Sequence, residues 1–205
     1  MKKISIIILS FFLLFLGERV WAQESGIVFG GSYTKLYEKT APGNISLGMG
    51  NPSFNYHFGY RYRQSMKNNL SMDATILYGQ RRTPLTSIYI MSDNPRFKFY
   101  YISIESILNR HLSKRLYIGL GLEPTWYIKT NSVFYTNEIR PLQNEIKPVF
   151  DIPLSVRLGY SFNHFELFAS YKYGTCNLVK NEKFDKLKSW DLQLSAYIPI
   201  FNRSK

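Results

Sequence analysis

The sequence lacks the residues that stabilise small disulfide-rich proteins or build metal centres. Its 205 residues include one cysteine, Cys176, and three histidines. A single thiol cannot form an intramolecular disulfide, and no group of His, Cys and acidic residues has metal-ligand spacing. Gly-rich phosphate loops and nucleophile elbows are missing as well. The sequence therefore predicts no catalytic residue, no cofactor and no metal, and Cys176 is expected to be an incidental loop residue.

Long apolar runs are missing after the first 22 residues. Before that point Lys2 and Lys3 precede an unbroken apolar segment, 4–16, and a Val-Trp-Ala sequence ends the region with small residues at −3 and −1. The segment is shorter than the ~20 residues that a membrane-spanning helix needs. The pattern is typical of a cleaved signal peptide over 1–22, with an uncleaved anchor as the alternative. We expect 23–205 to form one exported domain.

Acidic residues are scarce. The chain has 14 Asp and Glu against 26 Lys and Arg, a formal net charge of +12. A basic balance can indicate nucleic acid, but an exported chain rarely meets any. Anionic lipid head groups are the expected counter-charge. The sequence thus favours the lipid bilayer and lipopolysaccharide as partners, and no nucleic acid.

What the sequence does contain is a strict alternation of side chains. In 54–63 every even position is aromatic and every odd one is polar, charged or Gly. This period of two belongs to a β-strand whose two faces lie in different environments. Five further segments repeat it clearly and one over 97–110 repeats it less regularly. The five are 70–79, 116–123, 150–161, 165–174 and 190–198. A first strand is expected from about Gly26 to Glu38, without a clear parity.

The two faces of these strands differ in charge and in aromatic content. The charged residues all share the polar face: Arg61, Arg63, Asp73, Glu105, Glu123, Asp151, Arg157, Glu166, Lys172 and Asp191. The apolar face has aromatic residues near one end of the strands (Phe54, Tyr56, Tyr78, Trp126, Tyr171, Tyr173, Trp190) and near the other (Tyr60, Tyr62, Tyr160, Phe162, Phe165). A soluble sandwich, the alternative, does not require such belts, whereas membrane barrels have them at both interfaces.

The connections alternate between long and short. The long ones are 39–52, 81–96, 130–147 and 175–188, and the short ones are 64–69, 111–114 and 163–164. Outer-membrane barrels keep short turns and both termini in the periplasm, place long loops outside, and have an even number of strands. The sequence therefore predicts an all-β protein, an eight-stranded antiparallel up-and-down transmembrane β-barrel, monomeric, in the outer membrane.

Local features refine this prediction. Asn163-His164 is a two-residue hairpin in which Asn163 is able to adopt a positive φ. Pro124, Pro153 and Pro199 fall inside expected strands, where each lacks the N–H that the ladder uses, and we expect local bulges there.

The barrel interior is expected to be packed with side chains, because eight strands leave no aqueous channel. Inward Tyr117, Phe168 and Tyr197 should help to fill it. The ten inward charges then need partners, since an unpaired buried charge is very costly. If 64–69 closes a symmetric hairpin, Arg61 lies opposite Asp73.

Four stretches carry a resemblance to a known family. Tyr101–Leu108 (YISIESIL), Leu116–Pro124 (LYIGLGLEP), Phe150–Phe162 (FDIPLSVRLGYSF) and Glu166–Gly174 (ELFASYKYG) resemble the PorT-type outer-membrane β-barrel family of Bacteroidota. The likeness spans about 97–201 and rests on strand and Gly patterns. It implies an outer-membrane barrel rather than a chemistry, and a few members of the family serve type IX secretion. Many barrels end on an aromatic residue, whereas here four residues follow Phe201.

A catalytic role depends on His57, the histidine that faces inward in the outer half. Enzymes on this scaffold place a His beside a Ser or carboxylate near the outer rim. The expected cross-strand neighbours of His57, Leu77 and Gly59, cannot orient it, and His111 and His164 lie at periplasmic turns. We therefore expect a non-enzymatic structural or interaction protein of the cell envelope. The alternatives are a lipid acyl hydrolase or transferase and, less favoured, a narrow pore.

Recognition is expected in the extracellular loops, whose sequence is free of the folding pattern. The segment 130–147 mixes aromatic and aliphatic residues with charges, which suits contact with other envelope proteins. The outer connections also carry basic residues that would attract lipopolysaccharide phosphates, with solvated loops as the alternative. These are Arg81, Arg82, Arg96, Lys98, Lys180, Lys183, Lys186 and Lys188.

Overall fold

The computed structural model describes residues 23–39, 51–84, 96–133, 150–178 and 186–203. The expected signal peptide and half or more of each long connection lie outside these residues. The described residues form strands and turns, and they include no helix long and apolar enough to cross a membrane.

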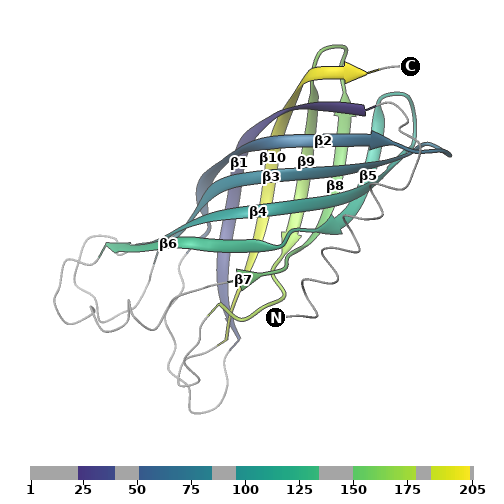
Figure 1. Cartoon of the computed structure of the whole chain (residues 1–205). Coiled ribbons are helices and arrows are strands. Elements are labelled where there is room, and N and C mark those ends of the chain that lie inside the picture. Colours follow the sequence, from purple (N-terminus) through teal and green to yellow (C-terminus); the bar gives the residue numbers. More distant parts are fainter. Residues whose placement is uncertain (1–22, 40–50, 85–95, 134–149, 179–185, 204–205) are drawn as a thin grey trace, which may run out of the picture.

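The strand segments of the described residues form one antiparallel sheet that closes on itself (Figure 1). They are β1 (Gln23–Lys39), β2 (Ser53–Ser65), β3 (Leu70–Pro84), β4 (Arg96–His111), β5 (Leu116–Leu122), β6 (Thr125–Val133), β7 (Phe150–Asp151), β8 (Leu154–Ser161), β9 (Glu166–Tyr173) and β10 (Lys186–Arg203). Both β5 and β6 pair with β4 and form one interrupted strand, as β7 and β8 do. Pairing of β3 with β4 and of β1 with β10 completes the ring, which confirms the eight-stranded barrel.

The first strand, whose parity the sequence leaves open, has a defined register. It pairs with β10 from Gln23 to Lys39 and with β2 from Gln23 to Thr34. Val28 and Ser32 point into the barrel and are buried, whereas Phe29 and Tyr33 are exposed on the wall. Two inward glycines, Gly26 and Gly30, blur the alternation in the sequence.

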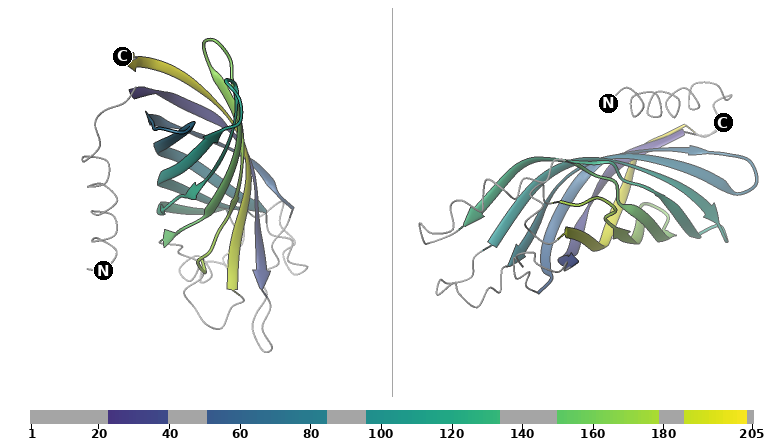
Figure 2. Two further views of the ribbon diagram at one scale, coloured as in Figure 1. Left: turned by 90° about the vertical axis from the view of Figure 1, so that its right-hand side faces the viewer. Right: turned by 90° about the horizontal axis from the view of Figure 1, so that it is seen from below.

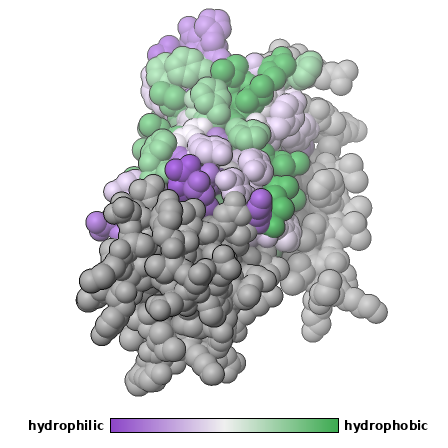
Figure 3. Space-filling view, turned by 90° about the vertical axis from the view of Figure 1, so that its left-hand side faces the viewer, coloured by the Kyte–Doolittle hydropathy of each residue, from purple (hydrophilic) through white to green (hydrophobic). Residues whose placement is uncertain are grey.

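The two faces of the wall follow the predicted alternation. Ser155 is 1% exposed and its neighbour Val156 is 45% exposed, while Gln193 and Leu194 are 2% and 63% exposed. Hydrophobic side chains gather on the described part of the wall in Figure 3. Aromatic rings pack on one another near both ends of the strands, as in Tyr171 with Trp190 and Tyr160 with Phe162. This arrangement suits a wall in contact with lipid.

The prolines interrupt the sheet in two ways. Pro124 separates β5 from β6 and Pro153 separates β7 from β8, and the two lie side by side because the Glu123 N–H donates to the Pro153 carbonyl at 3.0 Å. Pairing resumes beyond both prolines in the same register, so the expected bulges at Pro124 and Pro153 are wrong. At Pro199 the register shifts opposite Gly26, as expected for a bulge.

The short turns and the ends of β1 and β10 share one end of the barrel, seen at the top of Figure 1 and around the C label in Figure 2. The Phe162 N–H donates to the Phe165 carbonyl at 2.8 Å and closes the Asn163-His164 hairpin. The positive φ expected as an option at Asn163 is not adopted. Among the described non-glycine residues it occurs at Asn68 (61°) and Asn69 (58°), which close the turn between β2 and β3.

Candidate functional site

Charged side chains fill the barrel interior and form one connected chain of ion pairs. At the periplasmic end Arg63 pairs with Asp73 through Nε–Oδ1 (2.7 Å) and with Glu166 through Nη1–Oε1. Arg61 reaches the same two carboxylates, at 3.6 Å from Asp73 Oδ2 and 3.2 Å from Glu166 Oε2. Two guanidinium groups thus share two carboxylates across β2, β3 and β9.

The chain of pairs continues toward the outer end. Arg157 Nη1 lies 3.1 Å from Asp73 Oδ2, and Nη2 of the same side chain pairs with Glu105. Lys172 Nζ lies 2.9 Å from Glu105 Oε1 and 2.6 Å from Glu123 Oε2. We call these eight residues the charge ladder: Arg61, Arg63, Asp73, Glu105, Glu123, Arg157, Glu166 and Lys172. Its four cations and four carboxylates balance, which is what burial of so many charges requires.

The prediction that Arg61 lies opposite Asp73 is wrong, because the residue opposite Asp73 is Arg63, the next inward residue of β2. The register places Arg63 opposite Asp73 and Arg61 opposite Thr75, because β2 continues to Ser65 and the turn is shorter than 64–69. Arg61 still contacts Asp73, but diagonally.

Aromatic rings occupy the space between the guanidinium groups. The Arg61 and Arg157 carbons Cζ lie 4.3 and 4.2 Å from the centroid of the Phe168 ring. The Tyr117 hydroxyl donates to Glu166 Oε2 at 3.1 Å, and both Tyr117 and Tyr197 are fully buried, which confirms the predicted inward placement of these rings. Such contacts pair each of the guanidinium groups of Arg61, Arg63 and Arg157 with a ring face as well as with a carboxylate.

Arg81 corrects the prediction of a basic outer loop. Strand β3 extends to Pro84, and Arg81 points inward, where its Nη2 lies 2.6 Å from Asp191 Oδ2 and its guanidinium lies 4.8 Å from the Tyr101 ring. The inward position of Arg81 could not be predicted from the sequence, because the alternation between apolar and polar residues stops at 80–84. Arg82 faces the other way, and Lys180 and Lys183 lie outside the described residues.

Asp151 also departs from prediction, because it makes no ion pair with any residue that the structure describes. Its Oδ1 accepts backbone N–H groups from Ile152 (2.8 Å), Thr175 (3.1 Å) and Cys176 (2.9 Å) instead. Three such donors satisfy a buried carboxylate. They also fix the start of the connection after β9 over the outer end of the barrel, with Cys176 as a loop residue.

His57 has a partner that the sequence did not reveal. Its Nε2 lies 2.7 Å from Ser195 Oγ on β10, and its register neighbours are Gly79 and Gly30 rather than Leu77 and Gly59. The imidazole is 2% exposed inside the barrel. A hydrogen-bonded His–Ser pair is therefore present, but within the packed interior and not at a rim pocket.

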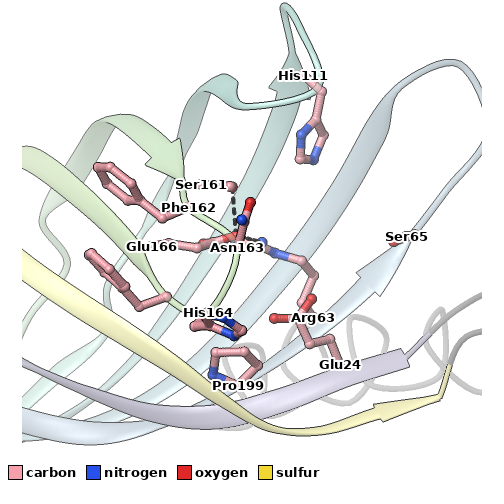
Figure 4. Close-up of a pocket in the computed structure, with 11 residues that line it drawn as sticks. Glu24, Arg63, Ser65, His111, Ser161, Phe162, Asn163, His164, Glu166 and Pro199 are labelled. Carbon is pink, nitrogen blue, oxygen red and sulfur yellow. Dashed lines mark hydrogen bonds and ion pairs between the residues drawn. The ribbon is translucent and has the colours of Figure 1, made fainter.

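A pocket of about 280 Å³ lies at the periplasmic end instead (Figure 4). Its lining comes from six strands and the turn between β8 and β9: Glu24, Arg63, Ser65, His111, Ser161, Phe162, Asn163, His164, Phe165, Glu166 and Pro199. The Arg63–Glu166 pair forms its floor, where Ser161 Oγ donates to Glu166 Oε1 at 2.9 Å. His111 and His164 lie at the end of the barrel that has the short turns, as expected, but their meeting in one pocket was not predicted. Among the described residues, no three or more His, Cys, Asp or Glu side chains are arranged so that they could hold a metal ion.

Comparison with known proteins supports the architecture. The model of the outer membrane protein beta-barrel domain matches residues 21–180. Neisserial surface protein A is 12% identical over 85% of this chain and 96% of its own, with a TM-score of 0.50. Ail of Yersinia pestis, solved with the heparin analogue sucrose octasulfate, is 17% identical over 87% and 99%, with a TM-score of 0.42. OprG of Pseudomonas aeruginosa is 12% identical over 90% and 95%, with a TM-score of 0.48. No curated protein sequence matches the chain.

Proposed function

The chain belongs to the outer membrane protein beta-barrel domain family, and from that premise we propose that it is a non-enzymatic envelope protein that acts through its outer surface. Its role is structural or interactive, with the extracellular loops as the recognition surface. Within the family we group it with the PorT-type barrels of Bacteroidota, on the strand and Gly patterns of 101–124 and 150–174.

The packed interior is the observation that carries this proposal. The charge ladder crosses the barrel from β2 to β9, and Tyr117, Phe168 and Tyr197 fill the space around it. A substrate or a file of hydrated ions would have to displace paired charges, which is costly in a low-dielectric interior. Function is therefore left to the surfaces, and we expect no stable conductance from the purified barrel in a planar bilayer.

Lipopolysaccharide is the partner proposed for the outer end of the wall. Arg82 and Lys98 are cross-strand neighbours on β3 and β4, and Lys129 follows on β6. Like charges directly opposite one another are unfavourable in a sheet, and the described residues supply no carboxylate that pairs with either. Lipopolysaccharide phosphates at the outer end of the wall would supply anions that pair with Arg82 and Lys98.

The phosphate contact is testable by charge removal. The double variant Arg82→Ala with Lys98→Ala should retain less lipopolysaccharide after purification in mild detergent, and the difference should shrink as salt is raised. Lys114→Ala, which removes an exposed cation at the opposite end, is the matched control. Equal retention by all three proteins would contradict the contact.

Deletion of Ser132–Gln143 tests the recognition role of the loops. We expect the shortened protein to insert and to keep its heat-modifiable mobility, because the deletion takes only the last two residues of β6 and leaves the charge ladder and the pairing of β1 with β10 intact. Proteins that co-purify with the intact barrel from native membranes should be lost. Retention of every co-purifying protein would contradict the proposal.

The lipid-modifying enzyme remains a second candidate because of the 2.7 Å hydrogen bond between His57 and Ser195. Burial of the pair argues against access by an acyl chain. We expect His57→Ala and Ser195→Ala to leave the acylation pattern of lipid A unchanged, as read by mass spectrometry. A change in that pattern shared by both variants would favour the enzyme.

A further inference from the structure

At the floor of the pocket at the periplasmic mouth, the carboxylate of Glu166 already has hydrogen-bond donors for both of its oxygens. Glu166 Oε1 accepts from Arg63 and from Ser161 Oγ, and Oε2 accepts from Arg61, Arg63 and Tyr117. A ligand would have to break the charge ladder to use this carboxylate. Any recognition in the pocket must therefore come from its walls.

Glu24 is the wall residue that the charge ladder does not account for. It projects from β1 into the pocket, is half-buried, and makes no ion pair with the residues that the structure describes. Arg63 attracts it, but that guanidinium is engaged by Asp73 and Glu166. Because the ladder is neutral without it, Glu24 gives the pocket one surplus negative charge. A partly desolvated carboxylate of this kind is stabilised by a cation.

The remaining walls suit a cation with a long apolar stem. His164 and Pro199 line the side of the pocket next to Glu24 (Figure 4). The rings of Phe162 and Phe165, stacked with centroids 4.6 Å apart, lie on the outer side of the same turn and are partly exposed. His111 stands at the far side of the pocket, held by Ser71 Oγ at 3.0 Å from its Nε2 (Figure 4). A volume of about 280 Å³ is large enough for one lysine or arginine side chain. Lysine and arginine combine such a stem with a charged head.

We propose that this pocket binds the ammonium or guanidinium group of a single lysine or arginine side chain presented by a periplasmic protein. The rim around the pocket defines the rest of that partner. Lys67, Arg110, Lys114 and Arg115 are all exposed at this end. The complementary surface is therefore acidic, with one basic residue that enters the pocket and pairs with Glu24.

The binding chemistry is tested with small probes on the intact barrel in lipid nanodiscs. Nα-acetyl-lysine methylamide and its arginine counterpart should shift the imidazole nitrogen resonances of His111 and His164 in a saturable manner. The norleucine counterpart, which has the stem without the charge, should not, and neither should acetate. Glu24→Gln should weaken binding of the lysine probe by about tenfold or more, equivalent to about 1.4 kcal/mol. Lys114→Gln, a neighbouring charge change outside the pocket, should leave binding unchanged or slightly tighter.

Three results would overturn the site. They are equal shifts with the lysine and norleucine probes, unchanged lysine affinity in Glu24→Gln, and binding of acetate without binding of lysine. Heat-modifiable mobility shows whether Glu24→Gln is folded, and the Glu24→Ala variant provides a second route to weaker binding.

The source of the cation is tested in cells with a photo-crosslinker at position 163. A crosslink to a periplasmic protein that is lost in Glu24→Gln supports the proposal. Crosslinks that persist in Glu24→Gln, or that form only with lipid or cell wall, would overturn the assignment of a protein partner. The loop deletion 132–143 should not affect this crosslink, so failure here and failure of the outer recognition role are distinguishable.

Discussion

The lumen face and the lipid face of this barrel hold their side chains in place by different means. On the lumen face Asp73 contacts three arginines from two strands, so its environment is set by the whole ring. On the lipid face Val156 is 45% exposed, and in a bilayer its environment is set by its depth. The same strands thus carry a cooperative surface on one side and a nearly independent one on the other. Substitutions should separate the two.

The largest effect is expected from Asp73→Asn, which leaves Arg61, Arg63 and Arg157 with one shared carboxylate fewer. Removal of one partner from a buried ion pair costs about 3–5 kcal/mol. Urea unfolding of the barrel in lipid vesicles measures this loss. Ser155→Ala, on the same face and uncharged, is the matched control and should cost under about 1 kcal/mol.

Cooperativity is tested by a second substitution on the same face. Arg63→Met combined with Asp73→Asn should be less destabilising than the sum of the two single changes. Strict additivity would show that the lumen face is as independent as the lipid face.

A smaller loss is expected from Val156→Arg on the lipid face. Arginine near the bilayer midplane costs about 2–4 kcal/mol, whatever the neighbouring residues are. The same unfolding assay applies, with Val156→Leu as the control. The loss should add to that of Asp73→Asn, since the two positions share no partner, and strong coupling between them would contradict the comparison.

Two glycines test crowding on the two faces. A Cβ at Gly159 would collide with the buried ring of Tyr117, and overpacking of this kind costs about 1–3 kcal/mol. At Gly31 the obstruction is the Phe54 ring at 2.6 Å, which is 72% exposed and free to swing into lipid. Gly31→Ala should therefore cost about 0.5 kcal/mol or less. Equal losses in unfolding free energy would show that both faces are equally rigid.

The smallest effect on stability is expected from single-cysteine labelling, which compares the accessibility of the two faces. In a Cys176→Ser background, Val156→Cys and Leu194→Cys should react with a lipid-phase maleimide, whereas Ser155→Cys should not, because it is 1% exposed inside the barrel. Comparable reaction at 155 and 156 would remove the distinction between the faces altogether.

Much of this comparison could be predicted from the sequence, because a period of two assigns each residue to one face and a membrane forces buried charges inward. The partners of the inward side chains could not be predicted, because they join residues that are far apart in the sequence. Arg157 and Asp73 are 84 positions apart, and His57 and Ser195 are 138 positions apart. Arg81 was missed where alternation stops, and the hydrogen bonds of Asp151 were missed because backbone donors leave no trace in side-chain patterns. The pocket that Glu24 lines could not be predicted either, because its walls come from strands that are far apart in the sequence.

Among the described residues, the longest strand pairing joins β1 with β10, from Gln23 with Arg203 to Lys39 with Lys186. Contacts between the two ends of a chain are the slowest to form, because the loop they close is the longest. Until β1 pairs with β10, the barrel interior is open to water, and its arginines and carboxylates stay hydrated. Dehydration of the whole charge set is thereby coupled to one late event. We therefore expect a chain whose interior charges are mismatched to complete this pairing more slowly.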